Sequence, residues 1–491
     1  MAETEQRLLY GGWTQPRKSG MFGGTSTGTY VFIAAAIVVL LCFALPLPGL
    51  VRIGAVLIAI VIVAPLWLSW GGKSWWEIAL ESRGRGGSLR SGENHYRSGG
   101  GTQVPSARCP GVLANSQLSE HVAIDGTRFG LIKVGDFYTV VLRTWPQGSE
   151  WIDQARLDQM VQQFGGAIAF NGQSPDVEAL VAVVETLPES AQRVALQHEK
   201  QVKENAHPVA KQIHTEANYA VPSAEVRLEG RMSITFNADI GMRHRDTVEQ
   251  ADDIARRLPR IVDVIATSGL PCRPMGEREI IAITRRGYSP ADEFDVETAL
   301  LQGQDLGFSW ADAGPLSADD KRGYYLHDAG MSVSYVMRKP PASAVDAHVL
   351  EEVLAPRSEI PRKRVVVCYR PHTPAESTRI VDEDHIDAER AVTGRVGRLS
   401  EEARLRVERT RQAREEQALG AGVSRFMISV TVTIPTDGDL SKVESLLSDL
   451  GTASRLDLRL AYNQQAALFA HGMGIGLVLP SHATISDRVA A

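Results

Sequence analysis

Two long apolar runs near the start of the chain constrain its fold more than any other feature. The first run, Tyr30–Leu47, has no charged residue, and the second, Leu50–Trp70, has Arg52 alone. Each run is long enough to cross about 30 Å of hydrocarbon as an α-helix. The Pro-Leu-Pro-Gly sequence between them favours a tight turn, because proline fixes φ and glycine tolerates unusual φ. The sequence therefore predicts an antiparallel transmembrane helical hairpin over residues 30–70.

The charges that flank these runs predict the orientation of the hairpin. Three basic residues precede the first run and five follow the second, whereas the turn is followed by Arg52 alone. Cytoplasmic flanks carry an excess of Lys and Arg, so we expect both termini in the cytoplasm and the protein in the inner (plasma) membrane. The four cysteines are far apart and show no metal-ligand spacing, which suits a reducing compartment.

A cluster of tryptophans around Lys73 raises the question of nucleotide binding. The sequence Gly72-Lys73-Ser74 matches the end of a P-loop, but Trp67 stands where that motif requires its first glycine. Tryptophan and lysine side chains instead suit a membrane–water interface. We therefore expect five interfacial anchors: Trp67, Trp70, Lys73, Trp75 and Trp76.

Composition and charge divide the rest of the chain. Residues 1–29 form an N-terminal segment, and residues 71–111 form a Gly/Ser/Arg-rich linker that we expect to be flexible. Nine Lys/Arg stand against five Asp/Glu up to Gly100, but 43 stand against 53 beyond it. The acidic part repels phosphate backbones, so we expect no direct binding of nucleic acid.

The sequence after the linker alternates between strand and helix patterns. A β-rich hairpin, a helix, two further strands and a second helix predict a first α+β lobe over 112–290. A similar order predicts a second α+β lobe over 291–491, which includes a long charged helix over 399–420. We expect mixed or antiparallel sheets that are covered by helices. The charged helix is either a solvated arm or a partner-binding helix.

Motifs that mark enzymes are missing from the sequence. It contains no H-E-x-x-H, no G-x-S-x-G and no complete Gly-rich phosphate loop. The acidic stretch Val381–Glu389 lacks the glycine and glutamate that an EF-hand requires, and His327 beside Asp328 lacks a nucleophile motif. We therefore predict a non-enzymatic protein without catalytic, cofactor-binding or metal-binding residues.

Short motifs carry a resemblance to conjugation proteins. The segment before the hairpin resembles the small inner-membrane subunit (PrgI-like) of VirB-type type IV secretion systems, in Tyr10, Pro16, Gly20 and Gly23. The body resembles the non-catalytic N-terminal part of the VirB-type secretion ATPase, in Trp145, Pro146, Gln464 and Phe469. Together these patterns resemble a family of actinobacterial conjugation-element membrane proteins.

This resemblance implies a membrane-anchored scaffold of a conjugative type IV-like secretion system. The Walker motifs of the ATPase would begin about where the chain ends at Ala491, so the ATPase is expected as a separate polypeptide. The expected partners are membrane lipids, that ATPase, other subunits of the secretion channel and further copies of the chain. Two alternatives stay open: a type VII (ESX-like) component resembling the EccE subunit, and a membrane-bound enzyme whose site is assembled from scattered residues.

Overall fold

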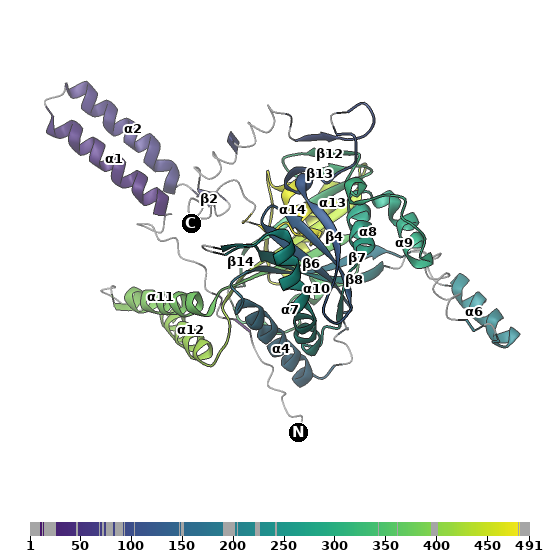
Figure 1. Ribbon diagram of the computed structural model, residues 1–491. Helices are drawn as coiled ribbons and strands as arrows, with labels where there is room; N and C mark the ends of the chain where they lie inside the picture. Colours follow the sequence, from purple (N-terminus) through teal and green to yellow (C-terminus); the bar gives the residue numbers. More distant parts are fainter. Residues whose placement is uncertain are drawn as a thin grey trace. The chain divides into compact units, whose positions relative to one another are not determined.

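The computed structural model divides the chain into two compact units, which are described separately (Figure 1). The body comprises Met1–Trp13 and His95–Leu477, and the hairpin unit comprises Thr14–Asn94 and Val478–Ala491. The structure describes residues 10–11, 13, 26–45, 48–67, 69–70, 73–74, 82–83, 92, 94–102, 104–146, 148, 152–189, 202–203, 205–220, 226–240, 243–341, 343–360, 362–393, 401–479 and 481.

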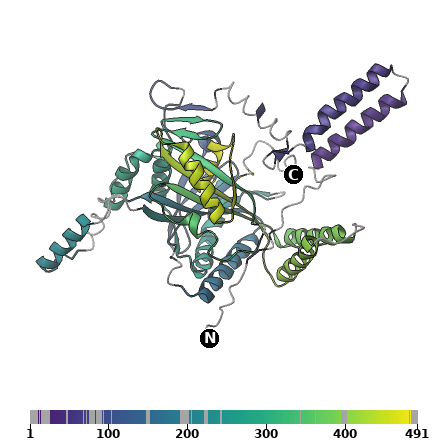
Figure 2. The ribbon, with the colours of Figure 1, turned by 180° about the vertical axis from the view of Figure 1, so that it is seen from behind.

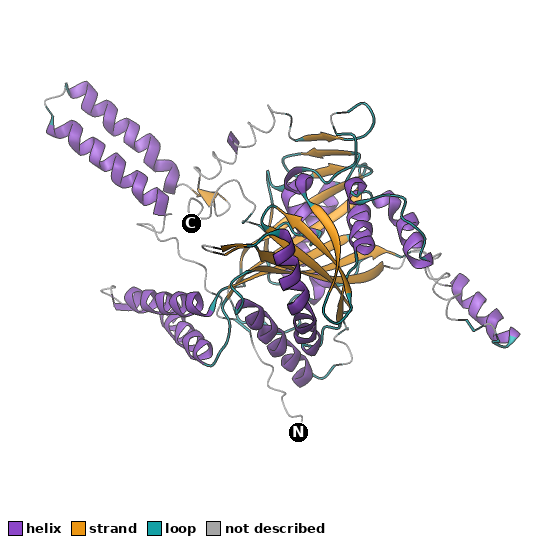
Figure 3. Ribbon diagram, viewed as in Figure 1, coloured by secondary structure: helices purple, strands orange, loops and turns teal. Residues whose placement is uncertain are grey.

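One large antiparallel sheet forms the centre of the body (Figure 3). Its strands are β3 (His95–Arg97), β4 (Gln117–Val122), β5 (Arg128–Val134), β6 (Phe137–Thr144), β7 (Val177–Pro188), β8 (Val226–Asn237), β11 (Cys272–Pro274), β12 (Ser317–Asp320), β13 (Tyr325–His327), β14 (Gly330–Lys339), β15 (Lys363–Pro371), β16 (Ser424–Pro435) and β17 (Asp457–Leu460). A separate two-stranded ribbon pairs β9 (Asp239–Ile240) with β10 (Arg243–His244).

The same strand order occurs in both halves of this sheet. The first half runs β4-β5-β6-β8-β7 and the second β12-β13-β14-β16-β15, with β11 beside β6 and β17 beside β14. Buried hydroxyl pairs mark equivalent positions. Thr139 Oγ1 lies 2.8 Å from Thr235 Oγ1 between β6 and β8, and Ser332 Oγ lies 2.7 Å from Thr433 Oγ1 between β14 and β16. A second hydroxyl pair, Ser334 with Thr431, also lies between β14 and β16. The strand ends decide the alignment, because Phe137 pairs with Asn237 where β6 begins and Gly330 pairs with Pro435 where β14 begins. Thr235 in β8 therefore corresponds to Thr433 in β16.

The two halves meet edge to edge through β7 and β15. These strands are antiparallel and place Arg364 opposite Glu185, so the two expected lobes share one continuous sheet. At the far edge, β3 pairs with β12 and places His95 opposite Asp319. Cys109 is also buried, so this end of the expected flexible linker belongs to the body.

Helices cover both faces of the sheet. Those of the body are α4 (Gln154–Gly172), α6 (Pro208–Ala220), α7 (Thr247–Thr267), α8 (Glu277–Tyr288), α9 (Glu293–Gln302), α10 (Glu351–Leu354), α11 (Pro374–Thr393), α12 (Glu401–Ala418), α13 (Leu440–Ala453) and α14 (Gln465–Gly472), with short 3₁₀ turns at Gly111–Asn115, Pro290–Asp292 and Trp310–Asp312. In the reverse view, the yellow C-terminal region lies across the sheet (Figure 2).

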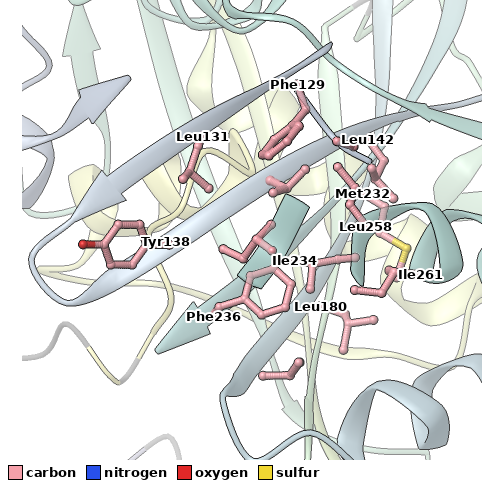
Figure 4. Close-up of a cluster of buried hydrophobic side chains, with 14 of the residues drawn as sticks. Phe129, Leu131, Tyr138, Leu142, Leu180, Met232, Ile234, Phe236, Leu258 and Ile261 are labelled. Carbon is pink, nitrogen blue, oxygen red and sulfur yellow. The ribbon is translucent and has the colours of Figure 1, made fainter. Parts of the chain in front are cut away.

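Alternation along the strands divides the buried apolar side chains between the two faces. Leu131 of β5 belongs to a core with α4 and α7, whereas the next residue, Ile132, belongs to a core with α8 and α14. Figure 4 shows the first of these cores, in which Leu258 and Ile261 of α7 lie against the sheet. A third core packs α10 and α13 on the second half of the sheet.

The long charged helix predicted from the sequence is α12, and it packs against α11. His385 Nδ1 lies 3.0 Å from Thr410 Oγ1, and both side chains are buried. Arg414 Nε forms an ion pair of 2.9 Å with Asp382 Oδ1. One side of α12 is therefore covered by α11, and binding of a partner by its exposed side stays a prediction.

The hairpin unit contains two apolar helices that lie side by side, α1 (Ser26–Ala44) and α2 (Gly49–Trp67). Many of their apolar side chains are exposed, including Leu40 at 71%, Leu50 at 85% and Val61 at 71%. Within the described residues, no helix has the combined length and apolarity that a membrane span requires. The α+β class is confirmed for the body, whereas insertion of the hairpin into a membrane stays a prediction.

Candidate partner-docking cleft

The residues predicted as the ends of the membrane spans and as interfacial anchors lie in or beside the two helices of the hairpin. Tyr30 of α1 and Leu50 of α2 have exposed side chains, and Trp67 is the last residue of α2. Trp70 in β1 (Ser69–Trp70) lies opposite Lys73 in β2 (Lys73–Ser74). The other predicted residues lie outside the described part of the chain: Leu47, Trp75 and Trp76.

In the body, a layer of paired arginine and glutamate side chains lies between the sheet and α8 and α9. Arg227, Glu229 and Arg231 alternate along β8, so their side chains point to one face. We call the whole set the arginine–glutamate layer. It consists of Arg143, Glu185, Arg227, Glu229, Arg231, Arg273, Glu279, Arg286, Glu293, Glu297, Arg362 and Arg364.

The inner end of this layer is closed to solvent. Glu185 accepts from Arg231 Nη1 at 2.6 Å and from Arg364 Nε at 2.9 Å. Burial alone would raise the pKa of Glu185, but the two guanidinium groups outweigh it and hold the pKa well below its usual range. Arg364 also stacks over the ring of Phe469, 4.7 Å from its centroid. This end of the layer is a structural ion cluster that no ligand can reach.

The outer end is centred on Glu229. Its carboxylate pairs with Arg286, with Arg227 at 3.3 Å and with Arg143 at 3.5 Å. Burial alone would raise the pKa of Glu229, but these cations, with Arg286 foremost, lower it to about 2. Glu279 is paired with Arg273 Nη1 at 2.7 Å, and this pairing lowers its pKa in spite of burial. Both carboxylates stay ionised near neutral pH, so neither suits general acid–base catalysis.

A cavity of about 780 Å³ opens at this outer end, and we call it the edge cleft. Its charged lining residues are Arg143, Arg227, Arg273, Arg278, Arg286, Glu120, Glu229, Glu279 and Glu297. Two apolar side chains also line the edge cleft and are about half exposed, Leu228 at 47% and Trp145 at 48%. A wall that combines apolar area with ordered charges is suited to holding a polypeptide segment.

A serine–histidine pair in the body has the contacts of a nucleophile and its base, but no substrate can reach it. His327 donates its Nδ1–H to the carbonyl oxygen of Tyr288 at 2.6 Å, and its Nε2 lies 2.7 Å from Ser332 Oγ. Burial lowers the pKa of His327 to about 3. Both side chains are fully buried, and Asp328 accepts from the backbone N–H groups of Leu316 and Ser317 rather than from the histidine. The pair is therefore structural.

The acidic stretch Val381–Glu389 lies inside α11. Its His385 contacts Thr410 of α12, as described above, and also lies 3.3 Å from Glu389. Across the described residues, no group of three or more His, Cys, Asp or Glu side chains is arranged to hold a metal ion.

The N-terminal motif residues that the structure describes dock on the body. Tyr10 and Val345 exchange two backbone hydrogen bonds of 2.7 Å, and the Tyr10 hydroxyl donates to Asp158 Oδ1 at 2.9 Å. The ring of Trp13 packs against Phe426 of β16, with 6.1 Å between centroids. The remaining motif residues of this segment lie outside the described residues: Pro16, Gly20 and Gly23.

The motif residues of the body lie in two places. Trp145 and Pro146 line the edge cleft. Gln464 lies at the N-cap of α14, and Phe469 is buried in the core beneath it. No protein-family model matches the chain, and no curated protein matches it. The cleft is therefore interpreted from its own geometry.

The arginine–glutamate layer was not predicted from the sequence, although the sequence pattern of one of its strands indicates it. In the strand that contains Arg227, Glu229 and Arg231, charges occupy every second position, which places them on one face. A strand in the centre of a sheet rarely carries such a row unless opposite charges cover it. The covering residues come from separate parts of the chain, so their identity could not be read from the same stretch.

Proposed function

We propose that this protein is a membrane-anchored, non-enzymatic scaffold of a conjugative type IV-like secretion system. In this proposal α1 and α2 insert into the inner membrane, the body lies in the cytoplasm, and the body docks a separate secretion ATPase. The mechanism is positional, because tethering raises the effective concentration of the ATPase at the channel without changing its chemistry.

One observation supports the membrane topology in this proposal. Tyr10 and Trp13, which precede the hairpin in the chain, contact Val345 and Phe426 of the body, which follows it. If the hairpin crosses a membrane, both of its ends must then emerge on the side where the body lies, as the flanking charges also predict. The exposed apolar side chains of α1 and α2 support insertion, because large apolar patches are normally covered by lipid or protein.

Affinity purification from cells that carry the complete conjugative element tests the docking. The full-length protein, extracted in detergent, is expected to recover a polypeptide with Walker motifs in a near-stoichiometric amount. A tagged membrane protein of similar size from the same cells is the control. If the full-length protein recovers no such ATPase, the proposed function is overturned.

A further inference from the structure

Strand β8 leaves part of one edge open beside the edge cleft. On one side, β8 pairs with β7 along Val226–Phe236, but on the other side it pairs with β6 along Gly230–Asn237 alone. The chain turns away after β6, where Trp145 N donates to Pro271 O at 3.0 Å. No strand of the described residues therefore pairs with β8 residues 226–229 on that side. The backbone groups that point there can bind another extended chain.

The edge cleft adjoins this open edge. Leu228 and Gly230 of β8 both line the cleft, together with Trp145 and Pro146 from the end of β6. A segment that adds to β8 here would cover the exposed part of the Leu228 side chain. Strand addition of this kind draws affinity from backbone hydrogen bonds and specificity from the side chains beside them.

Two arginines that line the cleft have unused donors. Arg227 Nε and Arg286 Nε are buried, and neither has an acceptor among the described residues. Both side chains are more than nine-tenths buried, at 9% and 6% exposed. Buried N–H groups without acceptors are costly, and donors on a charged group prefer a carboxylate. A carboxylate from a bound segment would satisfy them.

The second half of the sheet shows what covers the position that corresponds to Leu228. Because Thr235 corresponds to Thr433, Leu228 in β8 corresponds to Phe426 in β16. There, β16 also extends past its last pairing with β14, at Ser429. The ring of Trp13, from the N-terminal segment, packs on Phe426. The backbone of this segment bonds to Val345 rather than to β16. An aromatic side chain thus covers the position that corresponds to Leu228, which is open in the first half.

We propose that the edge cleft binds an extended segment of the secretion ATPase, which adds to β8. Side chains alternate along the added strand, so an apolar or aromatic side chain lies over Leu228 on one face of the sheet, and a neighbouring carboxylate lies beside Arg227 and Arg286 on the other face. This inference rests on the proposed function, because it takes the ATPase as the partner. It goes further in naming the docking site and the chemistry of the docked segment.

Photocrosslinking in cells that carry the complete element tests the site. The photoreactive residue p-benzoylphenylalanine replaces Leu228 in one full-length variant and Val248, an exposed residue of α7 outside the cleft, in the control. We expect irradiation to join the Leu228 variant, and not the Val248 variant, to the ATPase. Peptide mapping should find the crosslink in one short segment that contains Asp or Glu.

The outcomes separate the two proposals. If the ATPase copurifies but the Leu228 variant gives no crosslink, or gives the same crosslink as the Val248 variant, the site is wrong and the proposed function stands. A crosslink to a second copy of this chain also overturns the site. If the ATPase does not copurify with the unmodified protein, the proposed function itself fails.

Two substitutions of opposite charge at Leu228 provide an independent test. Leu228→Asp and Leu228→Lys both remove the apolar contact, but the aspartate alone repels an incoming carboxylate. We expect the amount of copurified ATPase to fall about tenfold further in Leu228→Asp than in Leu228→Lys, which matches about 1.4 kcal/mol of charge discrimination. Equal losses in the two variants would exclude an acidic segment, and no loss in either would exclude the site.

Discussion

Arg364 of β15 lies directly opposite Glu185 of β7, and its Nε donates a hydrogen bond of 2.9 Å to Glu185 Oε1. The two side chains are 1% and 3% exposed, and they stand at the join between the halves of the sheet. Arg231 shares the same carboxylate at 2.6 Å. One glutamate is therefore the shared counter-charge of two buried cations at the place where the two halves of the sheet meet.

Glu185→Gln is expected to destabilise the body strongly. The substitution keeps the shape of the side chain but leaves Arg231 and Arg364 buried without their counter-charge. Removing one partner of a buried ion pair typically costs about 3–5 kcal/mol. Urea unfolding of the full-length protein in detergent, followed by tryptophan fluorescence, measures this loss.

Glu178→Gln is the matched control in the same strand. Glu178 pairs with Arg370 at 2.7 Å, and both side chains are about a fifth to a quarter exposed. Partly exposed pairs contribute about 1 kcal/mol or less. Equal effects of the two substitutions would show that the buried cluster does not stabilise the join.

The stability of the body is expected to fall as the pH drops below 6.5 because of His327. Burial lowers the pKa of His327 from 6.5 to about 3 in the folded state. The unfolded chain therefore binds a proton that the folded body does not bind between these values. This stability is fully present above pH 6.5 and is lost as the pH falls toward 3, at a limiting slope of about 1.4 kcal/mol per pH unit.

His327→Asn should remove this part of the pH dependence. The asparagine amide can still donate to the Tyr288 carbonyl, as Nδ1 does, but it has no titratable group. Urea unfolding between pH 7 and pH 5 compares the two proteins, and His121→Asn, at a partly exposed position on β4, is the control. If His327→Asn keeps the slope of the unmodified protein, the buried histidine is not its source.

Trp13→Ala is expected to loosen the docked N-terminal segment. The ring of Trp13 packs on Phe426, and an aromatic pair of this kind contributes about 0.5–1.5 kcal/mol beyond its burial. Losing it should speed hydrogen exchange of the Val345 N–H, which donates to Tyr10 O, by about threefold to tenfold. Trp145→Ala, in the edge cleft, should leave this exchange unchanged. An unaltered rate in Trp13→Ala would mean that the contact does not hold the segment.

Local elements of the fold could be read from the sequence, but their neighbours could not. The strand predicted over 424–435 is β16, in which buried apolar residues alternate with buried serine and threonine residues over 428–433. The join of β7 to β15 brings together Glu185 and Arg364, which are 179 residues apart. Nothing in either strand specifies which edge it will pair with, since alternation reports the buried face alone.

The candidate site is harder to predict for a related reason. The edge cleft lies where β6 stops at Thr144, opposite Gly230, while β8 continues to Val226. The cleft therefore depends on the relative lengths of two strands. Its charges come from β4, β6, β8, β11, α8 and α9, and each of these charges is typical of a solvated surface when its own stretch of sequence is taken alone. Trp145 and Pro146 were singled out from the sequence by resemblance, and no local signal joined them to Arg227 or Arg286.

Ile58→Arg and Ile213→Arg together test whether the hairpin inserts into the membrane. Ile58 lies at the middle of α2 and Ile213 lies in α6 of the body, and each side chain is 62% exposed. If α2 crosses the bilayer, arginine at its centre costs about 2.5–3.5 kcal/mol, whereas arginine on a water-exposed helix costs little.

We therefore expect Ile58→Arg to reduce the share of protein that resists carbonate extraction from membranes, and Ile213→Arg to leave it unchanged. A gel-filtration profile of each purified variant checks that the body still folds. If both variants stay fully in the membrane, α2 is not embedded there. If both leave it equally, the body rather than the hairpin holds the protein at the membrane. Loss in Ile58→Arg alone is the result that insertion requires, because the two substitutions differ chiefly in the medium that surrounds the side chain.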